Sequence, residues 1–454
     1  MLRVAVIGSG PSGVYTAQSL IEQQAVPDIE VYVLDRLPCP YGLVRYGVAP
    51  DHEKIKSLQN NLRTVLEHPR VHFLGNVEVG APGLGVAELR EIFHAVVFCV
   101  GAATDRHLGI PGEELPGSHP ATEFVAWYSA HPDAAAVRFT LAARSAIVIG
   151  VGNVAVDVAR MLSRGAAELA TTDMPQGPLG ALADSRVEDV WMVGRRGPSQ
   201  AKFTTKELRE LGSLPGTEVR VQPEELTLDP AYLDPGELPA VGRRNVEVLR
   251  GWAERPTGAA TLVGRRIHLR FFLRPVEVLG DATGVRAVRF ERTAPDGQGG
   301  VRGTGEFEDI EGQLVLRSVG YRGTPQPGLP FDEATGTVPH LAGRVLRDGA
   351  PLAGVYVAGW IKRGPTGVIG TNRPCAKETA HSLLADAGSL ADRDTAEDPV
   401  AALTRAGQRP VLWPGWLAIE AAEAEWGHGL GRGTVKLADW EGLLDAARSA
   451  GVNG

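Results

Sequence analysis

The sequence predicts an α/β protein in which two Rossmann-like domains are built from one chain, the second inserted into the first. An apolar run at residues 2–7, a glycine turn at 8–13 and a helical segment to about residue 23 form a strand–turn–helix unit, and the same plan recurs at 146–162. Two apolar runs that end in glycine, near residues 102 and 323, mark where the chain leaves the first domain and returns to it. A length of 454 residues favours two or three domains.

The composition restricts the class of protein. With 43% apolar and 22% charged residues it is typical of a soluble globular protein. We expect a cytoplasmic protein that does not use a membrane, because no secretory signal and no run of about 18 apolar residues is found. A net charge of −8 makes nucleic acid an unexpected partner. The three cysteines are odd in number and form no CxxC pair, which argues against a disulfide framework and against a zinc or other metal site.

The first glycine turn reads GSGPSG. Gly8 permits the tight turn, Gly10 lets a pyrophosphate approach the backbone, and Gly13 lets the helix pack on the strand, while the first-turn amides face the phosphates. Asp35 ends the next apolar run at about the 20-residue spacing expected of an acid that binds ribose hydroxyls. This combination favours FAD or NAD, and an ordinary tight turn is the alternative.

A turn-rich loop without obvious period follows Asp35 and ends near residue 56. Long loops of this kind are often functional. His52 lies in it, directly after Asp51, which could simply cap the helix expected at 55–66. We then expect a strand or hairpin at 71–79 and a buried strand at 95–100.

The second glycine turn has Gly150, Gly152 and Ala155 in the pattern GxGxxA. The strand after it ends in Arg195 and Arg196, where the first unit has an acid. A guanidinium pair suits the 2′-phosphate of NADP, so the second turn is predicted to bind NADP; a solvated arginine pair is the alternative. The spacing is longer than usual, which we attribute to an insertion around 163–186.

Two acids lie on the helix predicted at 203–211. Glu207 stands three residues after Thr204, which fits a capping box. Glu210, one turn from Lys206, could equally be a solvent-facing helix charge. The structural role therefore stays open for both.

Residues 238–275 are rich in arginine, and such a stretch can steer an acidic partner although the whole chain is acidic. We expect antiparallel strands within 266–290, a glycine-rich turn at 293–305, and the return to the first domain after the apolar run 313–323. The arginines are Arg243, Arg244, Arg250, Arg255, Arg265, Arg266, Arg270 and Arg274.

The last landmark is a strand that ends at Gly359, followed by Trp360 and by the loop GPTGVIGTN, which leads into a helix from about Pro374. Gly367, Val368 and Ile369 suit a backbone that approaches a flat ligand, and Trp360 could flank an aromatic ring. A plain Gly/Pro loop is the alternative. Beyond Gly388 the tail is acidic and alanine-rich, with helical periods and no evident chemistry.

Taken in order, the stretches GSGPSG, PYGLVRYGVAPDH, GVGNVAVDVAR, VGRRGPSQAKFTTKELREL, RSVGYRG and GWIKRGPTGVIGTN are informative together. With them, the chain resembles the bacterial ferredoxin-NADP reductases of the adrenodoxin reductase type, including the mycobacterial members, as far as about residue 385. The resemblance implies a glutathione reductase-like plan, with a discontinuous FAD domain at 1–102 and 324–454 and an inserted NADP domain at 103–323.

The resemblance also implies site residues. His52 and Glu210 match a polar pair near flavin and nicotinamide, which would position the nicotinamide or relay a proton. Two departures stand out: Tyr41 replaces a tryptophan, and Val151 replaces a residue that is more often polar. The implied FAD contacts are Gly8, Gly10, Pro11, Ser12, Gly13, Asp35, Leu43, Val79, Trp360, Gly367, Val368 and Ile369. The implied NADP contacts are Arg106, Val151, Gly152, Asn153, Val154, Arg195, Arg196, Glu207 and Gly367.

The implied activity is hydride transfer from NADPH to FAD, followed by release of single electrons to a ferredoxin-type iron–sulfur protein that docks transiently through charge, with the arginine-rich stretch as the docking face. Three alternatives remain. A disulfide reductase would need a dithiol beside the flavin, which the sequence lacks. A flavin monooxygenase would use oxygen, and a redox sensor would hold NADP without turnover.

Overall fold

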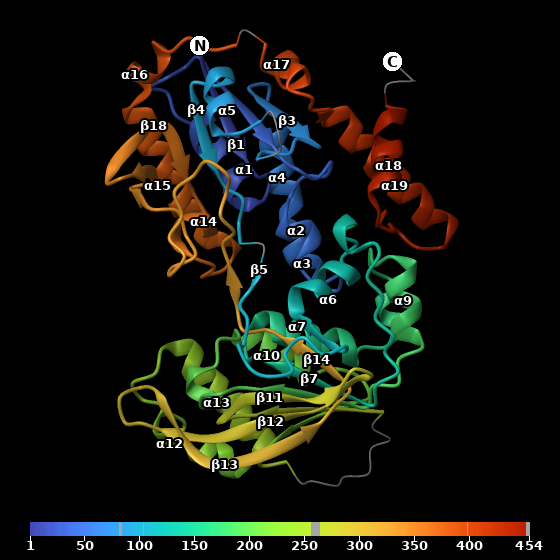
Figure 1. Cartoon of the computed structure of the whole chain (residues 1–454). Helices are drawn as coiled ribbons and strands as arrows, with labels where there is room; N and C mark the ends of the chain where they lie inside the picture. Colours follow the sequence, from blue (N-terminus) through green and yellow to red (C-terminus); the bar gives the residue numbers. More distant parts are fainter. Residues whose placement is uncertain (81–83, 103, 256–263, 397, 451–454) are drawn as a thin grey trace. The chain divides into compact units, whose positions relative to one another are not determined.

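The computed structural model describes residues 1–80, 84–102, 104–255, 264–396 and 398–450 (Figure 1). The chain forms two compact units. Unit 1 comprises Met1–Thr104, Ser129–Asp133 and Gly320–Gly454, and unit 2 comprises Asp105–Tyr128 and Ala134–Val319. Strands β5 (Thr104–Asp105) and β15 (Tyr321–Arg322) stand where the chain passes between the units. The short segment Ser129–Asp133, within the stretch assigned from sequence to the inserted domain, belongs to unit 1, and a 3-10 turn η1 (Pro132–Ala134) ends it.

Unit 1 contains an eight-stranded sheet in the order β16-β17-β18-β4-β1-β2-β3-β19. The five central strands pair in parallel. Strands β1 to β4 and the second half of β18 consist mostly of buried residues, as expected of strands covered on both faces. A hairpin, β16 and β17, extends one edge, and the tail strand β19 pairs antiparallel with β3 at the other. The strands are β1 (Leu2–Ile7), β2 (Ile29–Leu34), β3 (Val71–Gly75), β4 (Ala95–Phe98), β16 (His340–Leu341), β17 (Arg344–Arg347), β18 (Ala350–Val357) and β19 (Val411–Leu412).

Alternation along β1 divides the core of unit 1 into two layers. Val4 and Val6 face the layer formed by α1, α15 and the tail helices α18 and α19, whereas Ala5 and Ile7 face the layer of α5 and α17. The helix expected at 55–66 is interrupted at Ser57 and forms α3 and α4. The helices are α1 (Pro11–Ile21), α2 (Leu43–Tyr46), α3 (Glu53–Lys56), α4 (Leu58–Leu66), α5 (Val86–Ile92), α14 (Trp360–Arg363), η3 (Ile369–Thr371), α15 (Asn372–Ala385), α16 (Ala387–Ala391), α17 (Pro399–Arg405), α18 (Trp413–Gly429) and α19 (Trp440–Ser449).

Unit 2 is built on a six-stranded parallel sheet in the order β6-β14-β7-β8-β10-β9. An antiparallel sheet of β11, β12 and β13 lies in the same unit. The strands are β6 (Ser118–Pro120), β7 (Ser145–Ile149), β8 (Asp189–Val193), β9 (Thr217–Val221), β10 (Arg265–Arg270), β11 (Leu273–Asp281), β12 (Gly284–Pro295), β13 (Val301–Glu311) and β14 (Leu314–Arg317).

The prediction of antiparallel strands across 266–290 is confirmed for β11 and β12 and is wrong for β10. That strand joins the parallel sheet, because its apolar residues Ile267 and Leu269 are buried beside β8 and β9. The helices of unit 2 are α6 (Ala121–Tyr128), α7 (Asn153–Ser163), α8 (Ala166–Leu169), α9 (Gln176–Ala183), η2 (Pro198–Gln200), α10 (Thr205–Leu211), α11 (Pro223–Thr227), α12 (Pro230–Leu233) and α13 (Ala240–Ala253).

Each unit therefore contains a parallel sheet in which a strand, a glycine turn and a helix follow one another, β1 to α1 in unit 1 and β7 to α7 in unit 2. This confirms the predicted α/β fold with two Rossmann-like units. Among the helices that the structure describes, none is long and apolar enough to cross a membrane.

Candidate active site

The glycine turn of unit 1 shows which glycines the fold itself requires. Gly8 has φ +107°, and a Cβ added there would lie 2.6 Å from the Cys99 carbonyl oxygen. A Cβ added at Gly13 would lie 1.8 Å from the Gly8 carbonyl oxygen. At Gly10 the nearest atom would be 3.8 Å away, and no side chain caps α1 there. Close packing thus explains why glycine is required at positions 8 and 13. At Gly10 there is room for a side chain, so its absence suits the close approach of a ligand to the backbone.

The helix that follows begins with Pro11 at its first position, where a missing N–H costs nothing. Ser12 is buried in the next position and lies against Gly359, where an added Cβ would be 2.4 Å from the Ser12 hydroxyl. The first turn of α1 therefore meets the end of β18, the strand that leads to Trp360.

Asp35 stands at the end of β2, beside the glycine turn. One carboxylate oxygen accepts hydrogen bonds from the Ser9 amide at 2.8 Å and the Ser9 hydroxyl at 2.5 Å, and the other accepts from the Leu37 amide at 2.9 Å. Burial raises the pKa of Asp35, and the hydrogen bonds from Ser9 and Leu37 act in the opposite direction. The acid is thus held at the carboxyl end of its strand, where ligands of open α/β sheets bind.

A loop from Tyr41 to Gly47 lies over this turn. The Tyr41 amide donates to the Ser9 carbonyl at 3.1 Å, and a Cβ added at Gly42 would lie 2.9 Å from the Gly10 Cα. Leu43 opens α2 and is 40% exposed although its neighbours are buried. The loop therefore presents one apolar side chain next to the bare glycine.

A second apolar wall comes from the segment after β18. Trp360 begins α14, its ring centroid lies 5.5 Å from that of Tyr321, and its indole N–H is buried without a hydrogen-bond partner among the described residues. Gly367 has φ +83°, and Val368 beside it is 60% exposed. Val79, in the turn after β3, is partly buried against the core of unit 1. An unpartnered buried N–H and uncovered apolar side chains are the features that a flat, partly polar ring system would cover, so these residues fit a flavin.

His52 is buried and occupies the N-cap position of α3. Its carbonyl oxygen accepts from the Ile55 and Lys56 amides at 3.0 Å each, and its side chain does not cap the helix. The alternative in which Asp51 caps this helix is wrong, because the helix begins one residue later than that role requires.

The glycine turn of unit 2 repeats the pattern of unit 1. A Cβ added at Gly150 would lie 2.2 Å from the Ser318 carbonyl oxygen, whereas one added at Gly152, the uncapped start of α7, would meet nothing within 4 Å. The Val151 carbonyl accepts from the Lys202 amide at 2.9 Å. Asn153 and Val154, both partly exposed, form the first turn of α7. Here too the second glycine has no packing reason, which fits a site for a phosphate group.

Arg195 and Arg196 directly follow β8. Arg195 is exposed and Arg196 is partly buried, and neither guanidinium forms an ion pair with any residue that the structure describes. Their carbonyl oxygens are bound instead, by the Thr293 hydroxyl and the Phe272 amide. Two unneutralised guanidinium groups at the carboxyl end of a strand suit a phosphate dianion. Arg106 lies exposed in the segment after β5.

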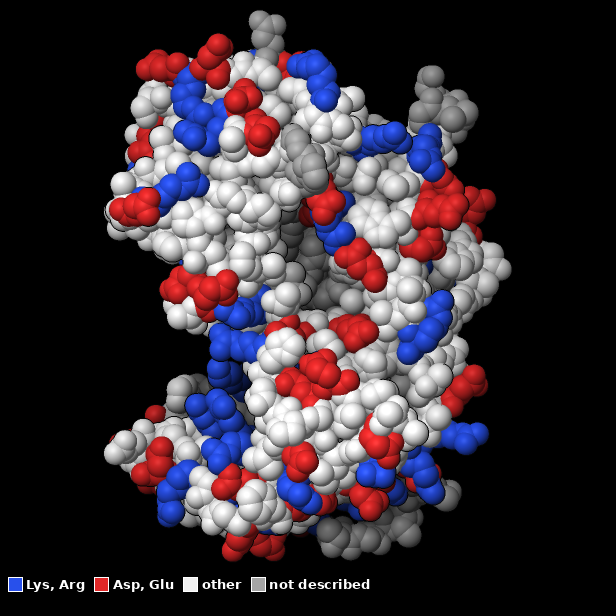
Figure 2. All heavy atoms as spheres, viewed as in Figure 1, with Lys and Arg blue, Asp and Glu red and all other residues white. Residues whose placement is uncertain are grey.

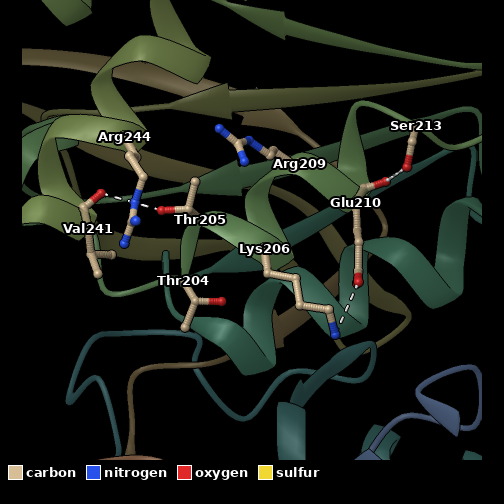
Figure 3. A pocket seen from close by; sticks show the side chains of 8 residues that line it. All are labelled: Thr204, Thr205, Lys206, Arg209, Glu210, Ser213, Val241 and Arg244. Atoms are coloured by element: carbon tan, nitrogen blue, oxygen red, sulfur yellow. Dashed lines mark hydrogen bonds and ion pairs between the residues drawn. The ribbon is translucent and has the colours of Figure 1, made fainter. Parts of the chain in front are cut away.

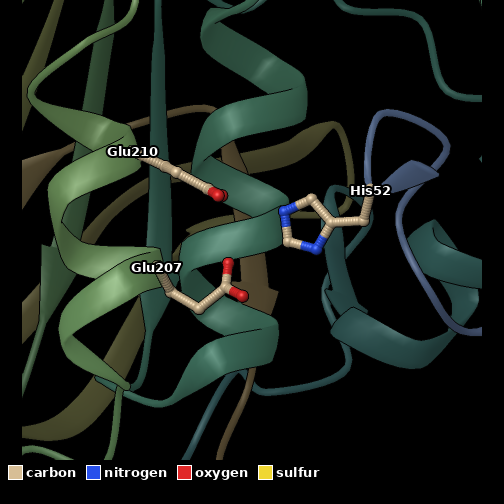
Figure 4. Close-up of side chains that lie close together, drawn as sticks. All are labelled: His52, Glu207 and Glu210. Carbon is tan, nitrogen blue, oxygen red and sulfur yellow. The ribbon is translucent and has the colours of Figure 1, made fainter. Parts of the chain in front are cut away.

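Glu207 and Glu210 share a cation that the sequence analysis missed. Arg160, on α7, is fully buried and lies 2.7 Å from Asp157, 3.3 Å from Glu207 and 3.6 Å from Glu210. Figure 4 shows both glutamates leaving the same side of α10 toward α7. Lys206 also lies 3.5 Å from Glu210, as the helix-charge alternative predicts.

Only half of the predicted capping box forms at α10. The Thr204 hydroxyl accepts from the Glu207 amide at 3.3 Å, but the Thr204 amide donates to the side chain of Asn153 at 2.8 Å. The Glu207 carboxylate is therefore directed to Arg160 and does not close the box.

The arginine-rich stretch is not a uniformly cationic surface. Arg270 is buried between Glu225 and Glu308, and Arg266 binds both oxygens of Asp189 at 2.6 Å. Of this stretch, Arg243 and Arg244 are exposed on α13. Arg250 and Arg265 donate to backbone carbonyl oxygens, so several arginines of this stretch serve the fold, which sequence spacing does not reveal.

A hollow of about 600 Å³ opens between α10 and α13 of unit 2 (Figure 3). A neighbouring hollow of about 320 Å³ shares Arg209 and Ser213 with it. Figure 2 shows basic side chains along the side of unit 2 on which α10 and α13 lie, and clusters of acidic side chains elsewhere on the same face. The larger hollow is lined by Thr204, Thr205, Lys206, Arg209, Glu210, Ser213, Val241 and Arg244.

The chain is similar to known proteins over almost its whole length. A family model described as pyridine nucleotide-disulphide oxidoreductase matches residues 2–192. The chain is 44% identical to NADPH-ferredoxin reductase FprA of Mycobacterium tuberculosis, over 97% of this chain and 98% of that protein. The chain belongs to the NADPH-ferredoxin reductase family of the adrenodoxin reductase type. This confirms the resemblance inferred from the motifs.

One further relative and one solved structure support the assignment. The mitochondrial NADPH:adrenodoxin oxidoreductase of Arabidopsis thaliana is 39% identical, over 98% of this chain and 95% of that protein. The solved structure of M. tuberculosis FprA in complex with NADPH superposes with a TM-score of 0.91 at 42% identity, covering 98% of this chain and 99% of that one. As a member of this family the protein is an oxidoreductase. Its cysteines, Cys39, Cys99 and Cys375, are all free, so none forms a disulfide.

Proposed function

We propose that this reductase binds FAD in unit 1 and NADP(H) in unit 2 and passes electrons from NADPH, through FAD, to a ferredoxin-type iron–sulfur protein. The main support for this assignment of cofactors is the difference between the residues that accompany the two glycine turns. In both turns no side chain caps the helix that follows, and the second glycine has open space where a Cβ would stand. The strand after the first turn is followed by Asp35, which Ser9 holds by hydrogen bonds. The strand after the second turn is followed by Arg195 and Arg196, which have no ion-pair partner among the described residues. Relatives named NADPH-ferredoxin reductase and a relative solved with NADPH support the cofactor choice.

In unit 1, the first turn of α1 would hold the pyrophosphate at Gly10 and Ser12, and Asp35 would bind the ribose. Leu43, Val79, Trp360 and the backbone at 367–369 would surround the ring system, with the Trp360 N–H available as a donor. Bound FAD would supply the conversion between two-electron and one-electron chemistry, which no side chain provides. The protein contributes orientation and the exclusion of water.

In unit 2, the first turn of α7, from Val151 to Val154, would hold the NADP pyrophosphate, and Arg195 and Arg196 would bind the 2′-phosphate. Arg106, Gly367 and Glu207 complete the contacts that the resemblance implies. Glu207 is buried and anchored on Arg160, so its position is fixed before any ligand binds. We assign His52 and Glu210 to positioning the nicotinamide or relaying a proton.

The hollow between α10 and α13 is the docking face that we assign to an acidic iron–sulfur protein. Lys206, Arg209 and Arg244 line it against a single acid, Glu210. Attraction between opposite charges raises the association rate and is screened by salt. Reversing charge with Arg209→Glu and Arg244→Glu should slow ferredoxin reduction at low salt and flatten its salt dependence. Arg286→Glu, an exposed arginine on β12 of the same unit, is the matched control; an equal effect there would remove the docking assignment.

Purified protein tests the proposal directly. It should show flavin absorbance, lose that absorbance on anaerobic addition of NADPH, and regain it on mixing with oxidised ferredoxin. A colourless protein that fails to reduce ferricyanide even after reconstitution with FAD would favour the sensor alternative. A rapid, stable adduct of the reduced protein with oxygen would favour a monooxygenase.

We also place the protein in the cytoplasm. Three cysteines without a disulfide support this location, since disulfides are rare in that compartment.

A further inference from the structure

The C-terminal tail contacts the loop that lies over the glycine turn of unit 1. Helix α18 belongs to this tail, and so does Lys436, in the connection to α19. Three loop residues contact the tail: Tyr41 packs against Trp416, Arg45 forms an ion pair with Glu423, and the ring of Tyr46 lies under the Lys436 ammonium. The sequence analysis found no chemistry in this tail, so the contacts call for a physical explanation.

The loop has an unfavourable backbone. Tyr41 has φ +83°, a conformation that bulky L residues rarely adopt, and it is almost fully buried. Such a residue persists only where its surroundings hold it. The ring of Trp416, on α18, packs edge-on against Tyr41, with centroids 5.8 Å apart and planes at 85°. The tail therefore contributes directly to holding the strained residue in place.

The tail binds both the side chain and the backbone of Arg45. Its guanidinium donates to the two carboxylate oxygens of Glu423 at 3.1 and 2.5 Å, and its side chain lies over the Trp416 ring at 5.1 Å. Its carbonyl oxygen accepts from the Lys436 ammonium at 2.6 Å. The side chains of Arg45 and Glu423 are at most 5% exposed, and Lys436 is equally buried. A buried charge group of this kind fixes its members because none of them can exchange its partner for water.

The tail is held in turn. Glu423 accepts from the Leu437 amide at 2.9 Å, which ties the chain before α19 to α18. The Lys436 ammonium also donates to the Ser129 carbonyl at 3.2 Å, within unit 1. The residues that bind Arg45 are therefore themselves fixed by hydrogen bonds to other residues of unit 1.

We propose that Glu423 and Lys436 are positioning residues for the flavin site: they hold α2, and with it Gly42 and Leu43, in the conformation that receives the ligand beside Gly10. The inference rests on the proposed FAD site of unit 1. It assigns to the C-terminal tail a share of that site, although the tail supplies no predicted contact to the cofactor. If the loop is ordered in only a fraction of the molecules, the apparent affinity for FAD is reduced to that fraction of its intrinsic value.

The structure offers a matched control on the same helix. Glu420, one turn before Glu423 on α18, pairs with Arg63 of α4 at 2.9 Å, and both side chains are about one-third exposed. Glu420→Gln therefore removes a contact between the tail and α4 and keeps the hydrogen bonds that hold Arg45. If the tail served stability alone, Glu423→Gln and Glu420→Gln would both lower the free energy of unfolding, to different extents, and neither would change the affinity for FAD.

The test combines hydrogen exchange on the flavin-free protein with titration of FAD into it. The amides of Tyr41, Arg45, Tyr46 and Gly47 all donate within the loop or to the glycine turn, so their exchange reports loop order. Glu423→Gln and Lys436→Met should remove most of the exchange protection of these amides and raise the Kd for FAD by about tenfold, because a tenfold rise requires that only about a tenth of the molecules hold the loop ordered. Glu420→Gln should change neither.

The outcomes separate as follows. A Kd for FAD within twofold of the unaltered protein in both variants overturns the inference, and so does loss of exchange protection at these amides without a rise in Kd. If Glu423→Gln fails to fold, Lys436→Met, which keeps the ion pair, carries the test alone. If the unaltered protein does not bind FAD, the proposed function fails, which is a different result from unaltered binding in the variants.

Discussion

Replacing Arg195 and Arg196 together by alanine tests the cofactor assignment of unit 2 most directly. Both guanidinium groups lack an ion-pair partner among the described residues, so a phosphate would be their only counter-charge. A hydrogen bond to a charged group contributes about 1.5–3 kcal/mol, and because Arg195 is exposed we take the lower value for each. Their loss then costs about 3 kcal/mol, or roughly a hundredfold in binding.

The assay is steady-state reduction of ferricyanide with NADPH and with NADH. We expect kcat/KM for NADPH to fall by roughly a hundredfold and that for NADH, which has no 2′-phosphate, to change by less than about threefold. Arg302→Ala, an exposed arginine on β13 of the same unit, should affect neither cofactor. Equal losses with both cofactors would show that the pair acts on something other than the 2′-phosphate.

Three further predictions concern glycines and buried charge. Gly13→Ala should unfold unit 1 because its Cβ would lie 1.8 Å from a backbone oxygen, whereas Gly10→Ala, with 3.8 Å of space, should keep the melting temperature and weaken FAD binding; equal melting temperatures would contradict this. Arg160→Met removes the buried guanidinium that contacts Asp157 and Glu207 and should lower the free energy of unfolding by about 3–5 kcal/mol in urea titration, and a loss below about 1 kcal/mol would refute the reasoning. Arg266 holds the pKa of Asp189 below its usual range, so this carboxylate stabilises the fold above the ordinary aspartate pKa and loses that contribution as pH falls through the lowered value. Asp189→Asn should therefore cost about 1 kcal/mol at pH 7 and less as the pH falls below the ordinary aspartate pKa, and a cost that does not depend on pH would refute the link.

Local pattern was enough to predict the elements that position the site. The strand, glycine turn and helix at Gly8 and Gly150 are contiguous in sequence, and their steric requirements are expressed within a few residues. The ends of β2 and β8 are likewise visible as the ends of apolar runs, which places Asp35 and Arg195 without knowledge of tertiary contacts.

The partners of charged side chains were not predictable in the same way. Arg160 and Glu207 are 47 residues apart, and nothing in the local pattern of α7 indicates that its arginine faces inward. Glu225 and Glu308 neutralise Arg270 from two other elements, which turns an apparent surface cation into a buried one. Alternation of residue types predicts which face a side chain occupies, but not which distant acid lies opposite it.

The strained Tyr41 and the contacts of the tail belong to the same class. A tyrosine before Gly42 carries no sequence signal for positive φ, because that conformation is imposed by Trp416 and by the turn beneath it. Here the consistency between local preference and fold is broken next to the proposed site, where such breaks are expected.

The five residues Ser129–Asp133 have a consequence for any attempt to divide this protein. They lie between two stretches of unit 2 yet bind within unit 1, where Ser129 accepts from Lys436 and Asp133 from Arg36 and from Trp440. A gene fragment for residues 105–319 would therefore contain this segment without the residues of unit 1 that it binds. Exchange of unit 2 between such reductases would therefore need two cuts more than a simple insertion.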